Sequence, residues 1–197
     1  MSTNLFDELD ADDNTLVRLH HRLERDAATD ELLDVAYRTV DSPVGTLLLA
    51  ATNVGLVRVA YDIEDHDAVL AALARWVSPR VLRAPTRLDA AARQLDEYFG
   101  KRRTTFEVPV DLRLTEGFRR SVIEHLRGIE YGRRESYAVV AAAVGNPRAV
   151  RAVGTACAHN PLPLVIPCHR VVRSDGSTGQ YVGGPAAKSA LLDLEAA

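Results

Sequence analysis

The sequence predicts a two-domain α+β protein: a small N-terminal α/β domain led by a β-hairpin, then a mainly helical C-terminal domain with a winged-helix-like helix-turn-helix. Two apolar β-type runs flank an Asn/Gly turn in the first half of the chain. Two short helical patterns flank a Gly-Asn-Pro turn in the second half. We therefore expect an N-terminal extension at 1–35, partly disordered, an α/β domain at 36–112 and a helical domain at 113–197.

Length and composition are those of an ordinary globular protein. The 197 residues, 47% hydrophobic and 26% charged, can bury the core of one large domain or two small ones. No stretch resembles a membrane span, and the N-terminus lacks the basic-then-apolar order of a signal peptide. Two cysteines cannot form a disulfide framework, so we expect a reducing, cytoplasmic location.

The net charge of −3 is unevenly distributed along the chain. Residues 1–115 hold fourteen Lys and Arg against twenty Asp and Glu, whereas residues 116–197 hold ten against seven. The C-terminal part therefore has the sign that faces phosphate groups, although charge alone is a weak indication of a nucleic-acid partner.

The N-terminal half shows the local signals of an extension and a sheet. Residues 1–14 carry five acids and no base, which predicts disorder, and 15–34 show a modest helical period that predicts one or two short helices. The two strands of the hairpin are expected at 44–51 and 56–61, and a further strand at 105–112.

Two helices complete the expected α/β domain. The first covers 65–77 and ends at a Ser-Pro pair. The second covers 86–99, with Thr86 and Asp89 as an expected capping box and Gly100 as its stop. No pattern in this half points to chemistry, so its expected role is that of a scaffold.

The C-terminal half begins with a helix expected over 116–127, with Thr115 as N-cap and Gly128 as its end. The two helices of the helix-turn-helix are expected at 136–144 and 148–158. Small Ala side chains in the first of them suit a close helix crossing.

The turn of the helix-turn-helix carries further signals. Asn146 is the expected N-cap of the second helix and Pro147 its first residue. Arg148 and Arg151 would then share one helix face, where phosphates or a groove are met. Ala-rich helix pairs are also common in plain packing, so both interpretations stay open. A last helix is expected at 185–194.

The stretch 160–171 is the most distinctive of the chain. Its apolar residues are interrupted by three prolines and lead into Cys168, His169 and Arg170. Proline fixes its own φ and pushes the preceding residue toward extended backbone, which predicts a stiff, extended and buried segment. The cationic neighbours are expected to lower the pKa of Cys168 and make it a nucleophile. The alternative is a small buried hydrophobe, the common role of a free cysteine.

Many residues of the C-terminal half occur in the order and register of a known family. They are Ser136-Tyr137, Gly145-Asn146-Pro147, Arg151-Ala152-Val153-Gly154, Asn160-Pro161, Ile166-Pro167-Cys168-His169-Arg170-Val171, Gly179, Tyr181, Gly183-Gly184, Lys188, Leu191-Leu192 and Glu195. With them the chain resembles the O6-alkylguanine-DNA alkyltransferases, the methylated-DNA–protein-cysteine methyltransferases. Residues 37–61 also resemble the start of the family's N-terminal domain, and the first 35 residues lie outside the resemblance.

The resemblance implies a DNA repair protein that transfers the alkyl group of O6-alkylguanine irreversibly to Cys168, once per molecule and without a cofactor. O4-alkylthymine is a second candidate substrate. The resemblance also implies that His169 takes the thiol proton through an ordered water and that Glu195 orients His169. Asn160 would hold the active-site turn, and Tyr137 would donate to N3 of the leaving guanine.

The resemblance places the helix-turn-helix in the minor groove of double-stranded DNA, with the target base flipped out of the duplex. Arg151 would fill the gap left by the flipped base, with Arg148, Ala152 and Tyr137 as further DNA contacts. The protein would be monomeric when free. The structural zinc of some members is not expected, because the chain has no cysteine before Cys157.

The implied lesion pocket is lined by Val171, Tyr181, Val182, Pro163 and Lys188. Tyr181 would form a wall, and main-chain groups of Val171 and Val182 would recognise the guanine edge. Position 182 is Val where some relatives carry Ser. A main-chain contact survives that difference, whereas the polarity of the pocket changes.

Three other hypotheses fit parts of the sequence. Cys157, His159, Cys168 and His169 suggest a metal cluster, but their spacing matches no common zinc site. A cysteine hydrolase would need a His remote in sequence and an oxyanion hole, for which no signature is present. A transcription factor would explain the helix-turn-helix but not the reactive cysteine stretch.

Overall fold

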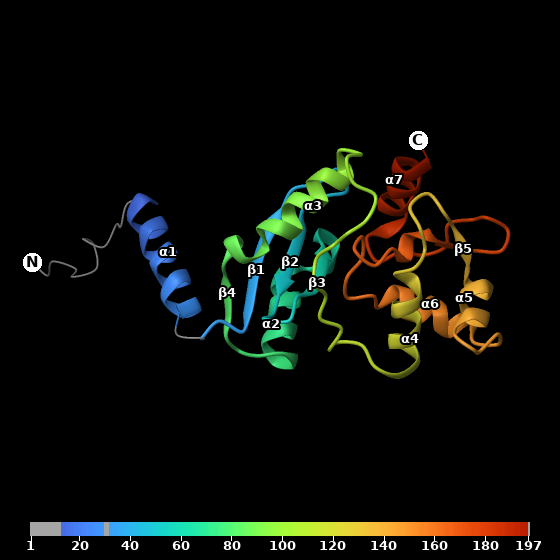
Figure 1. Cartoon of the computed structure of the whole chain (residues 1–197), viewed down its shortest axis with the longest axis horizontal. Helices are drawn as coiled ribbons and strands as arrows, with labels where there is room; N and C mark the ends of the chain where they lie inside the picture. Colours follow the sequence, from blue (N-terminus) through green and yellow to red (C-terminus); the bar gives the residue numbers. More distant parts are fainter. Residues whose placement is uncertain (1–12, 30–31, 197) are drawn as a thin grey trace, which may run out of the picture.

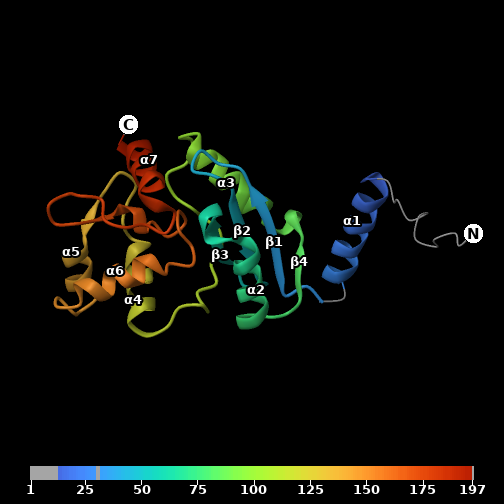
Figure 2. The ribbon, with the colours of Figure 1, turned by 180° about the vertical axis from the view of Figure 1, so that it is seen from behind.

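The computed structural model describes residues 13–29 and 32–196. Figure 1 shows a helix at one end of the long axis, a sheet with its helices in the middle, and a helical part at the other end. The view from behind shows the same order (Figure 2). The predicted fold class, a small sheet domain followed by a helical domain, is confirmed.

A helix named α1 (Asp13–Thr29) precedes the sheet. The sequence predicts one or two short helices here, and the described residues form one. The disorder expected for 1–14 concerns residues that lie, apart from the first two of α1, outside the described part of the chain. A 2.6 Å hydrogen bond from His20 Nε2 to the Arg83 carbonyl joins α1 to the sheet domain.

The sheet has the strand order β3-β2-β1-β4. β1 (Val35–Val40), β2 (Leu47–Ala51) and β3 (Leu56–Tyr61) are antiparallel, and β4 (Val81–Arg83) pairs parallel with β1. The hairpin of β2 and β3 confirms the prediction made from the Asn/Gly turn. β4 is unpredicted, because three residues are too few for an alternation of apolar and polar positions to show.

The sheet is covered on both faces. Alternate side chains of β2 point to opposite sides, as strand geometry requires. Leu48 packs in a core with α2 (His66–Trp76). Leu47 and Leu49 pack on the other side, in a core that continues through α3 (Asp89–Phe99) into the C-terminal helices. The second core therefore links the two halves of the chain.

The start of α3 differs from the prediction. A 3₁₀ helix over Pro85–Leu88 precedes it, so Thr86 lies inside that turn and no side chain caps α3. The proline fixes the φ of the turn and directs the chain into it. The predicted Thr86–Asp89 capping box is wrong, whereas Gly100 is the C-cap as predicted.

The strand predicted over 105–112, a stretch that the structure describes throughout, does not form. One bridge pairs Val110 with Leu56, through hydrogen bonds of 2.8 Å from Leu56 N to the Pro109 carbonyl and from Asp111 N to the Leu56 carbonyl. Pro109 has no N–H to continue the ladder. The segment connects the two halves of the chain.

The second half of the chain is mainly helical, as predicted. Its helices are α4 (Gly117–Leu126), α5 (Tyr137–Ala143), α6 (Val150–Ala158) and α7 (Gly184–Ala196), and its strands are β5 (Glu135–Ser136) and β6 (Val171–Val172). The Ser136 hydroxyl caps α5 by accepting a 3.2 Å hydrogen bond from Val139 N. β5 and β6 pair in parallel, which the sequence did not predict for strands of two residues.

Two predicted helix caps in this half are wrong. Thr115 is buried and its hydroxyl donates to the Leu112 carbonyl (2.7 Å), so it does not cap α4. Asn146 also does not cap α6; its carbonyl accepts from Ala149 N (2.9 Å) in the turn before the helix. The Thr115 hydroxyl therefore has its partner outside α4, and no side chain caps α6.

The later start of α6 moves Pro147 and Arg148 out of the helix and into the turn. Gly145 makes that turn with a φ of +79°, a region that favours glycine. Arg148 and Arg151 therefore do not share one helix face, and that prediction is wrong.

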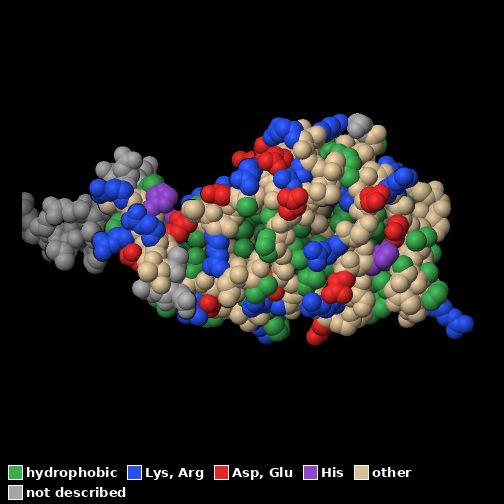
Figure 3. Space-filling view, in the orientation of Figure 1, with side chains coloured by type: hydrophobic (Ala, Val, Ile, Leu, Met, Phe, Trp, Pro, Cys, Tyr) green, Lys and Arg blue, Asp and Glu red, His purple; other side chains and the backbone are tan. Residues whose placement is uncertain are grey.

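Figure 3 shows Lys and Arg side chains interspersed with Asp and Glu over the face in view. Basic side chains also lie at the end of the molecule formed by the helix-turn-helix (Figures 1 and 3). Among the described helices, none has both the length and the apolar character needed to cross a membrane.

Candidate active site

The thiol of Cys168 lies in a tight, buried turn between α6 and β6. Cys168 is 1% exposed and opens a 3₁₀ helix over Cys168–Arg170. Asn160 Nδ2 donates to the Ile166 carbonyl (2.8 Å) and to Cys168 Sγ (3.1 Å), while its Oδ1 accepts from Leu162 N (3.0 Å). One buried amide thus holds both ends of the turn and touches the thiol.

The turn is buried as predicted but it is not extended. Leu164 has a φ of +73°, and Ile166 N donates to the Leu162 carbonyl (2.8 Å). Proline restricts its own φ and the residue before it. Leu164 is neither a proline nor the residue before one, so its backbone is free to adopt the positive φ that reverses the chain.

Burial controls the acidity of the thiol. It raises the pKa of Cys168 to about 11, against the opposing effects of the Asn160 hydrogen bond and the Lys188 charge. The Arg170 guanidinium faces Glu195 and the Ile129 carbonyl rather than the sulfur. The prediction that flanking cations lower the pKa of Cys168 is therefore wrong, and the free protein holds a neutral thiol.

His169 is a buried, neutral imidazole. Its Nε2 donates to Glu195 Oε1 (2.9 Å), and burial lowers its pKa, although the Glu195 carboxylate acts in the opposite direction. Nδ1 is buried and has no hydrogen-bond partner among the described residues. Because Nε2 carries the hydrogen that faces the carboxylate, Nδ1 keeps the lone pair with which an imidazole acts as a base.

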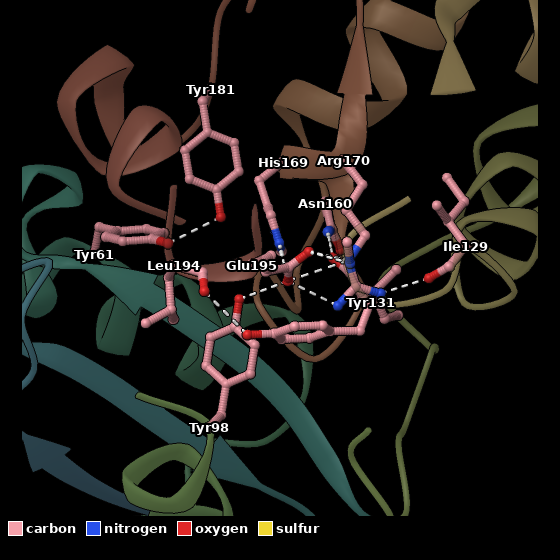
Figure 4. Close-up of polar contacts among 12 residues, drawn as sticks. Tyr61, Tyr98, Ile129, Tyr131, Asn160, His169, Arg170, Tyr181, Leu194 and Glu195 are labelled. Carbon is pink, nitrogen blue, oxygen red and sulfur yellow. Dashed lines mark hydrogen bonds and ion pairs between the residues drawn. The ribbon is translucent and has the colours of Figure 1, made fainter. Parts of the chain in front are cut away.

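Glu195 is the centre of a hydrogen-bond network (Figure 4). Its carboxylate accepts from the Tyr98 hydroxyl (2.7 Å), from Arg170 Nε (2.9 Å) and Nη2 (2.8 Å), and from Gly132 N (3.2 Å). Burial favours the protonated carboxyl group, but hydrogen bonds from His169, Arg170 and Tyr98 outweigh it and hold the pKa of Glu195 well below its usual range. A fixed carboxylate therefore faces the imidazole.

Tyr98 and Arg170 are site residues that the sequence did not identify. Tyr98 comes from α3 in the N-terminal half and is separated from Glu195 by 97 positions. In the sequence Tyr98 resembles any buried position of a helix, so no local pattern identifies it as a partner of Glu195. Arg170 stood beside the cysteine in the sequence, but nothing there indicated that it turns toward Glu195.

A hydrogen bond also joins β3 directly to the thiol turn. Val59 N donates to the Pro161 carbonyl (2.8 Å), and Arg58 Nη1 donates to the same carbonyl at 3.4 Å. An ion pair with Glu64 holds Arg58 in place. The N-terminal half therefore supports the site directly, which the scaffold role expected from its sequence did not specify.

Val171, Tyr181 and Val182 belong to or pack against the buried core that contains Cys168, and Lys188 is bonded to Val171. Tyr181 and Val182 are partly buried, and the Tyr181 ring stands edge-on to His169 with centroids 6.2 Å apart. Val171 is buried, and its carbonyl accepts a 2.6 Å hydrogen bond from the fully buried Lys188 Nζ. Burial lowers the pKa of Lys188. Pro163, the fifth, is buried inside the turn itself.

Tyr137 begins α5 and lies half-buried next to Lys188. The Lys188 ammonium is 5.8 Å from the Tyr137 ring centroid, and burial raises the pKa of Tyr137 to about 12. A Cβ at Gly179 would lie 2.9 Å from the Tyr137 hydroxyl, so the glycine allows that hydroxyl to approach the backbone. Tyr137 is thus a protonated donor at neutral pH.

Of the four predicted DNA contacts, Tyr137 is half-buried and the other three are exposed. Arg151 and Ala152 lie in the first turn of α6, and Arg148 lies in the turn before it. Neither arginine has an ion-pair partner within the described ranges 13–29 and 32–196. Two unpaired guanidinium groups are therefore available at this end of the molecule.

The described residues contain no group of three or more His, Cys, Asp or Glu side chains that could hold a metal ion. His159 is exposed, and its Nδ1 lies 2.8 Å from the Thr155 carbonyl. His169 Nε2 is bonded to Glu195 and is therefore not free to bind a metal ion. The arrangement does not fit the metal cluster considered from the sequence.

The chain matches two described protein families over most of its length. Residues 35–112 match "6-O-methylguanine DNA methyltransferase, ribonuclease-like domain", and residues 117–197 match "6-O-methylguanine DNA methyltransferase, DNA binding domain". The chain is 39% identical over 166 residues to the methylated-DNA–protein-cysteine methyltransferase of Mycolicibacterium paratuberculosis, covering 82% of this chain and 92% of that protein.

Solved structures of methyltransferases are also similar to this chain. The Mycobacterium tuberculosis O6-methylguanine methyltransferase superposes with a TM-score of 0.73 at 36% identity, covering 82% of this chain and 93% of that one. The M. tuberculosis protein called OGT, in complex with DNA, gives a TM-score of 0.71 at 36% identity, covering 82% and 92%.

The sheet domain, the helix-turn-helix and the buried thiol beside a His–Glu pair define a protein of the class that these matches share. The chain belongs to the methylated-DNA–protein-cysteine methyltransferase family, as its resemblance implied.

Proposed function

We propose that this protein repairs alkylated DNA by transferring the alkyl group from O6 of guanine to Sγ of Cys168, once per molecule. The observation that carries the proposal is a buried thiol held by Asn160, next to a neutral imidazole that a carboxylate orients. Membership in the methyltransferase family supports the reaction type. O4-alkylthymine remains the second candidate substrate.

In the proposed reaction Sγ attacks the sp³ carbon of the alkyl group, a C–S bond forms and the C–O6 bond breaks. The bonding electrons leave with the guanine. His169 accepts the thiol proton at Nδ1, the ring nitrogen that is free of protein partners in the described structure, through a bridging water. Glu195 stabilises the imidazolium that forms. The thioether is stable, which limits each molecule to one turnover.

Tyr137 is the proposed donor to N3 of the leaving guanine. Its raised pKa supports this role, because the hydroxyl is protonated at neutral pH and has a proton to share. The imidazolium later returns the thiol proton to solvent or to the product base. The net change is the replacement of a thiol by a thioether and of an O6-alkylguanine by guanine.

The pocket would recognise guanine through main-chain atoms. The carbonyls of Cys168 and Val171 accept from the exocyclic amine, and Val182 N–H donates to O6. The Val171 carbonyl already accepts from Lys188 Nζ, which leaves one lone pair for the base. Tyr181 forms a wall of the pocket.

Double-stranded DNA would bind at the helix-turn-helix through its minor groove, with the lesion flipped out at a cost of a few kcal/mol. Arg151, in the first turn of α6, fills the gap in the base stack. Tyr137 and Ala152 contact the DNA near the lesion, and Arg148 contacts phosphate from the turn. We also propose a protein that is monomeric when free, with domains at 36–112 and 113–197, working in the cytoplasm.

Single-turnover labelling tests the proposal. Duplex DNA with a radiolabelled O6-methylguanine should transfer one equivalent of label to the wild-type protein. Cys168→Ser should take no label but still bind DNA, because the substitution replaces only the sulfur. Cys157→Ser, which removes the other buried thiol, should keep the label at Cys168.

Other outcomes would identify other functions. A metal-binding protein or a repressor would take up no label in the wild type. A cysteine hydrolase would turn over repeatedly rather than stop after one equivalent. Label on Cys157 instead of Cys168 would remove the assignment of the acceptor.

A further inference from the structure

Two tyrosines from different halves of the chain bond to each other beside the site. Tyr61 ends β3, and Tyr181 lies in the Gly-rich loop before α7. Their hydroxyl oxygens are 2.9 Å apart, and their rings meet edge to face, with centroids 5.6 Å apart and planes at 74°. Figure 4 shows the two hydroxyls pointing at each other. Tyr61 is 2% exposed and Tyr181 is partly buried.

Gly183, in the same loop, also lies close to the Tyr61 ring. A Cβ at Gly183 would lie 2.7 Å from two carbons of the Tyr61 ring. Gly183 does not have a left-handed φ, so the close approach of the ring is what requires glycine there. The loop that carries Tyr181 and Val182 therefore packs against the ring of Tyr61.

Of the two tyrosines, Tyr181 is the one that contacts His169. The Tyr181 ring stands edge-on to His169, at 81° between the ring planes. Burial raises the pKa of both Tyr61 and Tyr181, so both remain protonated at neutral pH and the pair is a neutral hydrogen bond. Tyr181 packs against the buried core that contains Cys168, so we expect a movement of Tyr181 to change the space around the sulfur.

We propose that Tyr61 is a positioning residue for alkyl transfer: it fixes Tyr181, and with it the wall of the lesion pocket. This inference rests on the proposed role of Tyr181 as that wall. A fixed wall keeps a small methyl carbon in line with Sγ, whereas a large alkyl group fills the pocket and orients itself. Tyr61 therefore sets both the rate of methyl transfer and the preference for methyl over larger groups.

A double-mutant cycle tests the proposal. Rates of methyl and benzyl transfer are measured in single turnover at saturating duplex for Tyr61→Phe, Tyr181→Phe and the double variant. Tyr61→Phe should slow methyl transfer roughly fivefold, the equivalent of one hydrogen bond of about 1 kcal/mol. Benzyl transfer should slow less, and duplex affinity should stay at the wild-type value. The double variant should be no slower than Tyr181→Phe.

The matched control is Tyr37→Phe. The Tyr37 ring packs with the α2 side of the sheet, away from the thiol, so its loss of a hydroxyl should leave both rates unchanged. Wild-type rates for Tyr61→Phe, or effects of Tyr61→Phe and Tyr181→Phe that multiply independently, would overturn the proposal.

Gly183→Ala gives a second, independent test. In the wild-type background the added methyl group must displace the loop from Tyr61, so transfer should slow. In a Tyr61→Leu background the smaller side chain removes the clash, and Gly183→Ala should cause no further loss. An equal loss in both backgrounds would mean that Tyr61 does not hold the loop.

Unfolding in urea separates failure of this inference from failure of the proposed function. The hydroxyl pair should show coupling in the free energy of unfolding, whether or not the protein transfers alkyl groups. A wild-type protein that takes no methyl group would remove the proposed function and this role with it. A pair that is coupled in unfolding but uncoupled in transfer would overturn the positioning role alone.

Discussion

Cys168 and His169 lie next to each other in a turn from which water is nearly excluded. Burial disfavours the charged form of each, so the thiol keeps its proton and the imidazole stays neutral. Glu195 remains ionised, because Tyr98, Arg170 and His169 all donate to it. The sulfur therefore carries no negative charge until the thiol proton moves to the imidazole.

This arrangement predicts a particular dependence of the transfer rate on pH. The pKa of His169 is lowered from 6.5, so the rate should be flat at neutral pH and fall only as the pH drops below 6.5 and the base is protonated. Single-turnover rates between acid and alkaline pH measure this profile.

His169→Gln removes the proposed base and serves as the comparison. Its residual rate should climb with pH toward the pKa of Cys168, about 11, because hydroxide must then ionise the thiol. A wild-type rate that also climbed steadily through neutral pH would show that the imidazole does not take the proton.

At the scale of elements, the thiol turn depends on one amide. Asn160 is fully buried and satisfies Leu162 N, the Ile166 carbonyl and the sulfur. A buried polar group that loses its partner costs about 1–3 kcal/mol. The turn therefore holds its shape only while this side chain is present.

Asn160→Ala should lower the free energy of unfolding by about 1–3 kcal/mol, because it leaves buried groups unpaired. Asn160→Asp should keep the bond from Leu162 N but lose the donor to the sulfur, which raises the pKa of Cys168 further and slows transfer. Urea unfolding and single-turnover rates measure the two effects. Asn53→Ala, in the exposed β2–β3 turn, is the control. Wild-type stability and rate in both Asn160 variants would contradict this account of the turn.

The elements with a clear local period were predictable from the sequence. The β2–β3 hairpin, α2, α4 and α7 lie close to where apolar spacing placed them. The predicted helix caps at Thr86, Thr115 and Asn146 are wrong. Pro85 begins a 3₁₀ turn that includes Thr86, the Thr115 hydroxyl donates to a nearby carbonyl, and α6 begins only at Val150. The two-residue strands β5 and β6 were missed, since pairing partners far apart in sequence leave no local signal.

At the scale of the whole molecule, the sheet domain and the helical domain share one core and meet at the site. The sequence proposed Cys168 from its neighbouring residues, and the resemblance added the roles of His169 and Glu195; the structure brings these last two into contact. Tyr61 and Tyr98 were not found, because their partners lie 120 and 97 positions away. Contacts of that range depend on the packing of the two domains, which no local pattern records.

Arg151 is exposed in the first turn of α6, at the end of the molecule formed by the helix-turn-helix. Arg151→Ala should slow repair of a lesion in duplex DNA by roughly tenfold or more, because flipping costs a few kcal/mol and we propose that the arginine fills the gap. Transfer from free O6-benzylguanine should be unchanged, because a free base needs no flipping.

Arg148→Ala is the matched variant in the turn before α6. It should weaken duplex binding and make the dependence on salt less steep by roughly one phosphate contact. Duplex repair by Arg151→Ala at the wild-type rate would contradict the assignment of Arg151.

We propose that one sulfur of this protein accepts one alkyl group permanently. The most direct test is the intact mass of the protein after incubation with an excess of duplex DNA that contains O6-methylguanine. We predict a gain of one methyl group and no more, located at Cys168 by peptide mapping, together with unmodified guanine in the DNA. Unchanged protein mass, or repaired DNA in excess over protein, would contradict the account.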